Sequence, residues 1–293
     1  MVGGWDGVDE FVAVARAASF TAGARSFGAS VTHMSRTVAR LEGRLGAQLF
    51  NRTTRSVYLT ETGRIFFDRC QRLVDEREDA IAGIASQGAP SGNLRVTCSY
   101  ALGEQFIAPL IREFALQHPA LSVELDLDNG IVDIVSRDYD LAVRTGHLED
   151  SRLIATRVAQ RELVTVASRH YLSSRGEPYN VADLVSHDYL VGSSQKWHFR
   201  RGQTYRPRGR WRCNSGSTVV EACLAGMGIC QLPAFYVYKH LSDGRLQELL
   251  REEKPEDEPI WAVYPTRRHL SPKVSGLVSL IRTRLQDRIL THD

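Results

Sequence analysis

The residues best suited to a binding task lie on a short stretch near the start of the chain, from Ser19 to Leu41. Apolar residues there recur at spacings of three and four, so they fall on one face of a helix. They are Val31, Met34, Val38 and Leu41. The opposite face and the helix start carry hydroxyl, imidazole and guanidinium groups, which suit contacts to DNA phosphates and base edges. The expected DNA contacts are Ser30, Thr32, His33, Ser35, Arg36 and Arg40.

A shorter helix precedes this one, and a glycine separates the two. Thr21 can cap the first helix, Gly28 permits the turn that ends it, and Ser30 can cap the second. This is the order of a helix-turn-helix. An amphipathic helix pair with an ordinary solvated face fits the same residues.

Charge favours the DNA-binding alternative. Between Arg16 and Arg64 there are eight arginines and two acids, a net charge of +6, whereas the whole chain carries +3. Charge concentrated in one short segment is typical of a surface that neutralises phosphates. We therefore expect this segment to contact DNA.

A basic hairpin is expected after the second helix. The apolar residues 49–50 and 57–59 flank a polar tip whose arginines suit a minor groove or the backbone and whose threonines suit phosphate oxygens. The expected contacts are Arg52, Thr53, Thr54 and Arg55. A solvated turn is the alternative. With a further helix from Val8 to Ala15, residues 1–60 are predicted to form a winged helix-turn-helix domain.

A long helix without proline is predicted from Glu61 to Ser86. Its apolar residues approximate a heptad seam, which usually pairs with another helix, and a symmetric dimer matches two DNA half-sites. We expect Phe66, Leu73 and Ile81 to be buried against a second copy. Residues 61–92 are therefore predicted to be a dimerisation helix and hinge.

From residue 93 to 293, predicted strands alternate with helices, which indicates an α/β fold with a largely parallel sheet. One helix is expected from Ile131 to Ser136, and the last from Pro272 to Leu285. Two lobes are expected, the first from residues 93–161 and 267–293 and the second from 162–266. Small ligands bind such folds outside the carboxyl ends of strands.

Four polar residues follow predicted strands at that edge. They are Ser99, Tyr100, Arg144 and Thr145. Together with the N–H groups of the next helix, they favour a small anionic or polar ligand. Ser215 precedes a helix start and is a further candidate from the second lobe. Strand termination and helix capping are the alternatives for the hydroxyl residues.

The chain resembles the LysR-type transcriptional regulators along nearly all of its length. The resemblance is carried by SFTAGARSFGAS, MSRTVARLEGRLGAQLFNRTTRSVYLTETG, GNLRV, DYDLAVRTG, LAGMGICQLP and WAVYPTRRHLSPKV. It departs from the family at Val31, where many members have proline, and at His33, where a small residue is common. The missing proline leaves Ser30 as the cap, and His33 should alter the base preference.

This resemblance implies a winged helix-turn-helix, a dimerising linker helix and a two-lobed effector domain similar to periplasmic binding proteins. It also implies that the segment near Lys196 and Trp197 lies across the effector cleft. The expected partners are double-stranded promoter DNA, a small-molecule effector and further copies of the chain in a homodimer or homotetramer.

Several other classes of function are disfavoured by the sequence. We find no GxSxG, P-loop, HExxH or dinucleotide fingerprint, so we expect no enzyme, and histidines and cysteines at ligand spacing are lacking, so we expect no metal or cofactor. The N-terminus lacks a signal peptide and no apolar stretch spans a bilayer, so we expect a cytoplasmic protein without a membrane partner. A solute-binding protein and an α/β enzyme remain the rival functions.

Overall fold

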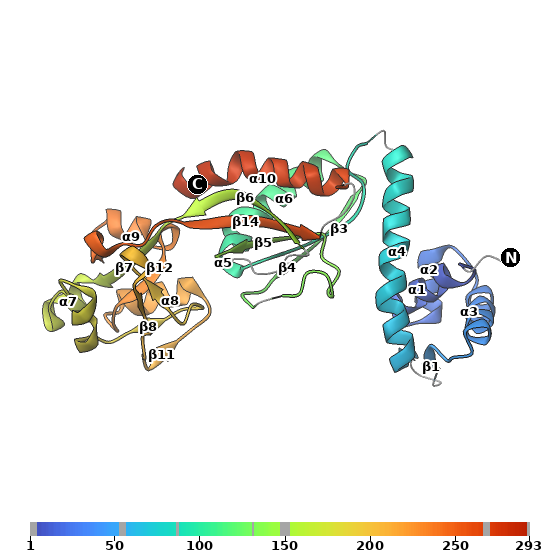
Figure 1. The fold of residues 1–293 in the computed structure, drawn as a ribbon, viewed down its shortest axis with the longest axis horizontal. Helices are drawn as coiled ribbons and strands as arrows, with labels where there is room; N and C mark the ends of the chain where they lie inside the picture. Colours follow the sequence, from blue (N-terminus) through green and yellow to red (C-terminus); the bar gives the residue numbers. More distant parts are fainter. Residues whose placement is uncertain are drawn as a thin grey trace. The chain divides into compact units, whose positions relative to one another are not determined.

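The structure, a computed structural model, describes residues 5–52, 57–85, 88–130, 132–146, 153–265 and 270–291, with only the backbone given for residues 52, 76, 78–80 and 82–85. The chain divides into two compact units, Met1–Gly88 and Ala89–Asp293 (Figure 1). The division falls inside the predicted hinge. No helix in the described part of the chain is both long enough and apolar enough to span a membrane.

The first unit contains the predicted helices and hairpin. Its elements are α1 (Val8–Ala17), α2 (Phe20–Phe27), α3 (Val31–Leu45), β1 (Phe50–Arg52), β2 (Val57–Leu59) and α4 (Glu61–Ala85). The Ser30 side chain caps α3 as predicted, but α2 is capped by Ser19, two residues before the predicted Thr21. Gly28 ends α2 at φ 72°, a left-handed conformation that glycine adopts without strain.

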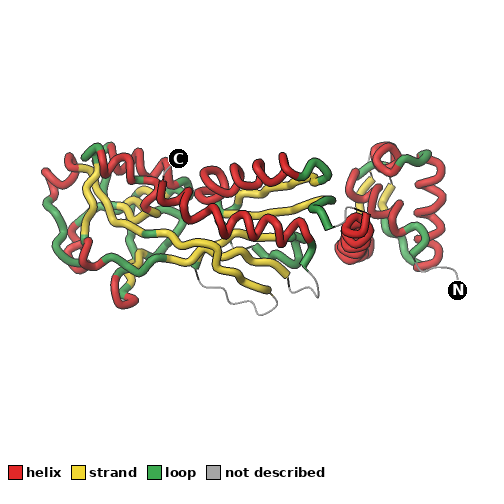
Figure 2. Tube along the Cα trace, turned by 90° about the horizontal axis from the view of Figure 1, so that it is seen from above, coloured by secondary structure: helices red, strands yellow, loops and turns green. Residues whose placement is uncertain are grey.

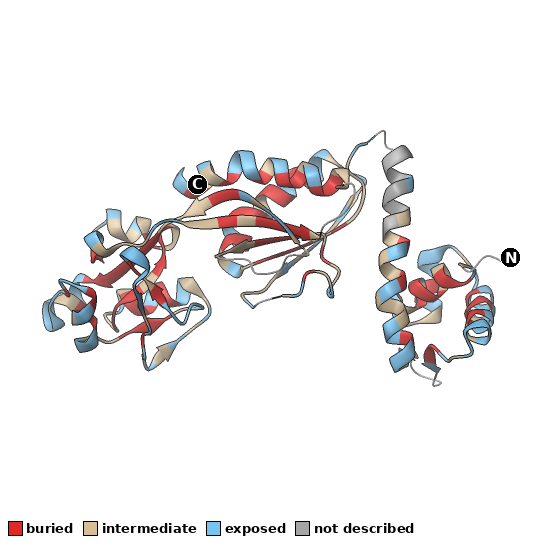
Figure 3. Ribbon diagram, viewed as in Figure 1, coloured by how far each residue is buried: buried red, intermediate tan, exposed pale blue. Residues whose placement is uncertain are grey.

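The core of the first unit joins α4 to the helix-turn-helix. Phe11 is fully buried, and its ring centroid lies 5.2 Å from that of Phe50 and 5.3 Å from that of Phe66. Cys70 and Val74 of α4 are buried in the same cluster. Figure 3 shows buried positions in the helices of this unit, α4 included. Phe66, one of the three predicted dimer residues, thus packs inside its own chain.

The second unit begins with a lobe built on a five-stranded sheet in the order β4-β3-β5-β14-β6. The strands are β3 (Gly92–Cys98), β4 (Leu121–Leu127), β5 (Leu141–Thr145), β6 (Leu153–Arg161) and β14 (Glu258–Pro265). The helices are α5 (Tyr100–Leu102), a π-helical turn (Gly103–Ile107), α6 (Ala108–Gln117) and α10 (Pro272–Thr291). Apolar residues of α6 and α10 cover one face of the sheet (Figure 2).

Two expectations for this lobe are wrong. Residues 134–138 form turns in place of the predicted helix, because the Asp133 carboxylate accepts hydrogen bonds from the N–H groups of Val135 and Ser136. Ile131 lies outside the described residues. Strand β14 pairs with β5 and β6, so the second lobe ends before Glu258, not at residue 266.

The second lobe is inserted between β6 and β14. Its three-stranded sheet, in the order β12-β7-β13, is antiparallel throughout, in contrast to the largely parallel sheet that we predicted. Its helices are α7 (Arg169–Arg175), α8 (Gly216–Leu224) and α9 (Tyr238–Ser242), and its 3-10 turns are Val181–Ser186, Arg200–Gly202, Ala234–Tyr236 and Arg251–Glu253. Its strands are β7 (Leu163–Ser168), β8 (Leu190–Val191), β9 (Trp197–His198), β10 (Thr204–Tyr205), β11 (Trp211–Arg212), β12 (Cys230–Pro233) and β13 (Leu246–Leu249).

Candidate DNA-binding surface and ligand cleft

Helix α3 has one buried face and one exposed face, as its sequence period requires. Met34, Val38 and Leu41 are buried in the core of the first unit, where α3 contacts α1 and α2, together with Thr37. The exposed side chains are Thr32, His33, Arg36 and Arg40, and Ser35 lies at the boundary. Val31 is exposed, contrary to the prediction, because it is the first residue of the helix and lies beyond the edge of the core.

The exposed residues of α3 differ in how far they are engaged within the chain. The Ser30 hydroxyl accepts the N–H of His33 at 3.2 Å, and the His33 ring lies 3.1 Å from a Glu10 carboxylate oxygen. Arg40 donates to the Thr37 hydroxyl at 3.2 Å. Arg36 forms no hydrogen bond or ion pair with any described residue. Its guanidinium is thus available in full to an external partner.

The base of the predicted wing is a short antiparallel hairpin. Phe50 pairs with Leu59 and Arg52 with Val57. One Glu42 carboxylate oxygen accepts the N–H groups of Leu49 at 2.8 Å and Phe50 at 3.1 Å, which fastens β1 to the end of α3. The predicted contacts Thr53, Thr54 and Arg55 and the side chain of Arg52 lie outside the described residues.

The three predicted dimer residues of α4 differ in how far they are exposed. Phe66 is half-buried against Phe11, inside its own unit. Leu73 and Ile81 are 49% and 60% exposed. Phe66, Cys70 and Val74 face the core of their own unit, and Ile81 lies beyond the last of them along α4.

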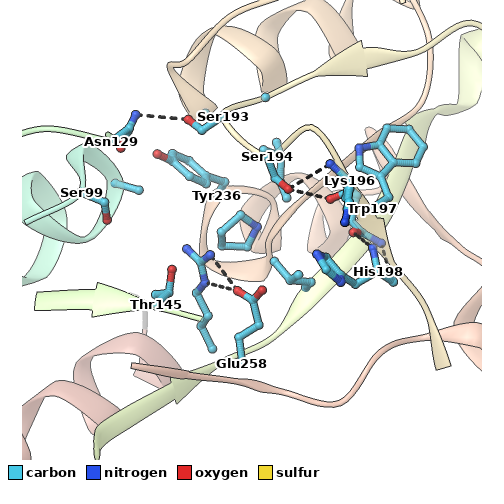
Figure 4. A pocket seen from close by; sticks show the side chains of 18 of the residues that line it. Ser99, Asn129, Thr145, Ser193, Ser194, Lys196, Trp197, His198, Tyr236 and Glu258 are labelled. Carbon is cyan, nitrogen blue, oxygen red and sulfur yellow. Dashed lines mark hydrogen bonds and ion pairs between the residues drawn. The ribbon is translucent and has the colours of Figure 1, made fainter. Parts of the chain in front are cut away.

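The second unit contains a cavity of about 320 Å³ between its lobes (Figure 4). Four predicted effector residues line it, namely Ser99, Thr145, Lys196 and Trp197. The Ser99 hydroxyl oxygen is inaccessible to water and has no hydrogen-bond partner among the described residues. A buried hydroxyl without a partner is uncommon, and a bound polar molecule would satisfy it.

The other three predicted effector residues do not line the cavity. Arg144 alternates with Thr145 along β5 and so faces the other side of the sheet, where it donates to the Thr97 hydroxyl at 2.8 Å and to the Asp128 carbonyl oxygen. Burial lowers the pKa of Arg144. The side chain of Ser215 caps α8 by accepting the N–H of Thr218. Tyr100 is largely exposed and does not line the cavity.

Trp197 lines the cavity but belongs mainly to the core of the second lobe. Its side chain is 1% exposed, and its ring packs edge-on against Tyr189 at 5.7 Å. A ligand would therefore meet the edge of this residue and the neighbouring segment, not an open indole face.

Residues that we did not predict connect the two lobes across the cavity. The Asn129 side-chain amide donates to the Ser193 hydroxyl at 3.2 Å and to the Asn214 carbonyl oxygen at 3.0 Å. Its oxygen accepts the N–H of Tyr100 at 3.0 Å. Asn129 is the second residue after β4, so the same strand-end rule that selected Ser99 also applies to it.

A second unpredicted feature is an ion pair at the floor of the cavity, where the chain passes between the lobes. Arg161, at the end of β6, donates to the Glu258 carboxylate at 2.8 and 2.9 Å (Figure 4). Glu258 begins β14 and is the register partner of Arg161. The two residues lie 97 positions apart, so no local sequence pattern signals the pair.

The remaining lining is neutral and polar or apolar, which suits binding more than bond-breaking. Gln231 holds the backbone of His198 by accepting its N–H and donating to its carbonyl oxygen, both at 2.8 Å. Burial raises the pKa of the nearby Cys98 thiol to about 12, so it stays protonated and weakly nucleophilic at neutral pH. In the described ranges there is no group of three or more potential metal-ligating side chains.

Comparisons with known proteins agree with this arrangement. The family model of the LysR substrate binding domain matches residues 87–286. The family model of the bacterial regulatory helix-turn-helix protein, lysR family, matches residues 5–64. The chain is 33% identical over 277 residues to the HTH-type transcriptional activator AaeR of Escherichia coli (strain K12), covering 92% of this chain and 90% of that protein. It is 34% identical over 283 residues to the HTH-type transcriptional regulator PtxR of Pseudomonas aeruginosa, covering 94% and 91%.

Solved structures give the same result. The full-length virulence activator AphB of Vibrio cholerae matches with a TM-score of 0.60 and 27% identity, and CrgA of Neisseria meningitidis with a TM-score of 0.58 and 30% identity. Each comparison covers 94% of this chain and 97% of the other. The predicted resemblance is thereby confirmed, and the chain belongs to the LysR family of transcriptional regulators.

Proposed function

We propose that this regulator binds double-stranded promoter DNA through α3 as a symmetric oligomer, and that a small molecule in the cleft of the second unit alters that binding. The observation that carries the DNA-binding part is the exposed face of α3. An amphipathic helix that buries Met34 and Val38 must turn Arg36 outward, and Arg36 has no partner in the described part of the chain. Arginine on such a helix can pair bidentately with guanine in the major groove.

The oligomer is proposed from α4. Leu73 and Ile81 are large apolar side chains on a long helix, and both are substantially exposed. Burying them against a second copy removes apolar surface from water. A two-fold symmetric pair would also present two copies of α3 to two half-sites.

The effector is proposed to be small and polar or anionic. Ser99, Thr145 and Lys196 bring two hydroxyls and an ammonium group to one cavity, and the Ser99 hydroxyl lacks a partner among the described residues. A ligand can shift the conformation only through different affinities for its two forms. Bonds that cross between the lobes, such as those of Asn129, are where such a difference would arise.

The DNA-binding proposal is tested by selecting bound fragments from genomic DNA and measuring their affinity by gel shift. Arg36→Ala should weaken the selected site by about 1–3 kcal/mol and weaken random DNA less. Arg282→Ala, an exposed arginine of the second unit, is the control. If Arg36→Ala left both affinities unchanged, the proposed orientation of α3 would be wrong.

The oligomer is tested by sedimentation. Leu73→Glu should dissociate it, because an unpaired carboxylate in an apolar seam is unfavourable. Leu116→Glu changes a more exposed leucine and serves as the matched control. The same oligomer in both variants would contradict the α4 assignment.

The effector site is tested with a panel of small carboxylates and polar metabolites, by thermal stabilisation of the full chain. Ser99→Ala should reduce the shift given by a stabilising compound, whereas Ser173→Ala, on the exposed surface of α7, should not. Retention of the full shift in Ser99→Ala would place the ligand elsewhere.

A further inference from the structure

The second lobe contains a strongly basic segment of which the proposed function uses only Lys196. Residues 189–220 include six arginines and one lysine but no Asp or Glu, a net charge of +7. The whole chain carries +3, so the other residues together carry −4. This charge is as concentrated as that of the helix-turn-helix, although it lies in the other unit.

Four of these arginines alternate with residues that face the core. Arg206, Arg208, Arg210 and Arg212 are all exposed. The residues between them are Tyr205, Pro207, Gly209 and Trp211, which are buried or half-buried. None of the residues 203–212 has a positive φ, and the segment runs from β10 into β11. The chain bends at Arg210, and the alternation in exposure on both sides of the bend leaves all four arginines on the outer surface of the lobe.

The inward residues fix this segment to the lobe. The Tyr205 hydroxyl bonds to that of Tyr189, and β11 pairs with β8. A Cβ atom at Gly209 would lie 2.1 Å from the Tyr189 carbonyl oxygen, so only glycine allows this approach. The arginines therefore extend from a rigid base. We call Arg206, Arg208, Arg210 and Arg212 the arginine ridge.

The ridge arginines have no partners inside the chain. None of the four forms a hydrogen bond or ion pair with a described residue. Other arginines of the same unit do, for example Arg95 with Glu124 and Arg175 with Asp188. Four adjacent unpaired guanidinium groups repel one another, so a binding partner must be anionic and extended.

We propose that the arginine ridge is a second, sequence-independent contact to the DNA phosphate backbone. From Arg206 to Arg212 the chain spans at most about 20 Å, because it bends at Arg210. The phosphates of one DNA strand form a continuous anionic row that such a row of guanidinium groups can follow. Arginine is the side chain best matched to phosphate geometry.

Two other partners fit less well. A membrane or a hydrophobic protein interface requires exposed apolar anchors. Residues 189–220, all of which are described, include no large hydrophobic side chain that is exposed. The proposed promoter binding by α3 would also keep the ridge near DNA at a high effective concentration.

The test measures binding of the full-length chain to a random-sequence 60-bp duplex across a potassium chloride series. Replacing all four ridge arginines with alanine should lower the slope of log affinity against log salt by about 3–4, since each phosphate contact contributes about 0.9. Affinity at 50 mM salt should fall about tenfold or more. A matched variant removes four other exposed charges, at Arg112, Arg169, Lys239 and Arg282, and should change the slope by less than about one.

Replacing the four ridge arginines with lysine keeps the charge and should keep most of the slope. It also covers the case in which the alanine variant is poorly folded, because a lysine variant with a lowered slope would contradict a charge-based contact. Equal slopes for the ridge and matched alanine variants would overturn the proposal. Binding to phosphatidylglycerol vesicles that depends on the ridge, with the DNA slope unchanged, would also overturn it and assign the ridge to a lipid surface. Arg36→Ala should abolish the preference for the selected site, while replacing the ridge arginines in that variant should still lower the salt slope. This result would separate the ridge contact from the contact made by α3.

Discussion

Helix α3 and the cleft of the second unit bring polar groups together in opposite ways. Helix α3 presents Thr32, His33, Arg36 and Arg40 from nine consecutive residues. The cleft collects its lining from eight separate parts of the chain, between Ser99 and Glu258. The exposed face of α3 depends on one helix and the core beneath it. The cleft depends on every contact that holds the two lobes together. The two sites should therefore fail in different ways.

Phe11→Ala should have the largest effect and should act on only one site. The ring is fully buried among three other phenylalanines of the first unit, so its loss should destabilise that unit by about 3–5 kcal/mol. Hydrogen exchange measured by segment should show faster exchange in α1 and α3 and no change in β3 or β14. Phe27→Ala, at a largely exposed phenylalanine, is the control. Equal acceleration in both units would mean that they do not fold independently.

Arg161→Ala should damage the cleft and spare α3. It leaves the mostly buried Glu258 carboxylate without its partner. We expect the free energy of unfolding to fall by about 2–3 kcal/mol, less than the loss of about 3–5 kcal/mol seen when a fully buried pair is broken. Arg161→Ala combined with Glu258→Ala should be less destabilising than Arg161→Ala alone. Chemical denaturation of the second unit gives both values. Strictly additive losses would indicate that the two residues do not interact.

Glu42→Ala tests whether α3 also controls the wing. The carboxylate accepts two backbone N–H groups at the start of β1, and bonds to a charged acceptor contribute about 1.5–3 kcal/mol. We expect a loss of about this size in the first unit and faster exchange at Leu49 and Phe50. Glu61→Ala, in the first turn of α4, should cost only about 0.3–1 kcal/mol through the helix dipole. If both variants lost a similar amount of unfolding free energy, Glu42 would not be an anchor for β1.

Asn129→Ala should have the smallest effect on stability and the most specific effect on the cleft. The hydrogen bonds of Asn129 join neutral groups near the surface, so we expect the free energy of unfolding to fall by only about 1 kcal/mol. The N–H of Tyr100, which donates to Asn129, should exchange faster. Ser194→Ala, which changes a hydroxyl bonded only within its own segment, is the control. Unchanged exchange at Tyr100 would show that the Asn129 side chain does not hold this N–H.

The same contrast explains what the sequence predicted well. The period of Met34, Val38 and Leu41 is a local property, and it predicted the orientation of α3 correctly. Strand β6 was missed because its burial does not alternate regularly, and Arg144 was misplaced because proximity to a strand end does not specify the face of the sheet. The Arg161–Glu258 pair and the role of Asn129 depend on how distant segments meet, which one sequence does not contain.

The arginine ridge is a different case, because its alternation is local and visible in the residues 205–212. The net charge of +3 for the whole chain conceals this second basic segment, because acids elsewhere balance it. Net charge is therefore more informative when it is followed along the chain than when it is summed.

The register of β6 and β14 has a consequence for protein engineering. Arg161 and Glu258 are opposite each other on neighbouring strands, so the two points at which the chain leaves and re-enters the first lobe are adjacent. Insertions and excisions are tolerated best where chain ends lie close together. We therefore expect that residues 162–257 can be removed and the ends rejoined by a tight reverse turn, which would leave a single-lobed domain. Other sensor domains could then be inserted between Arg161 and Glu258.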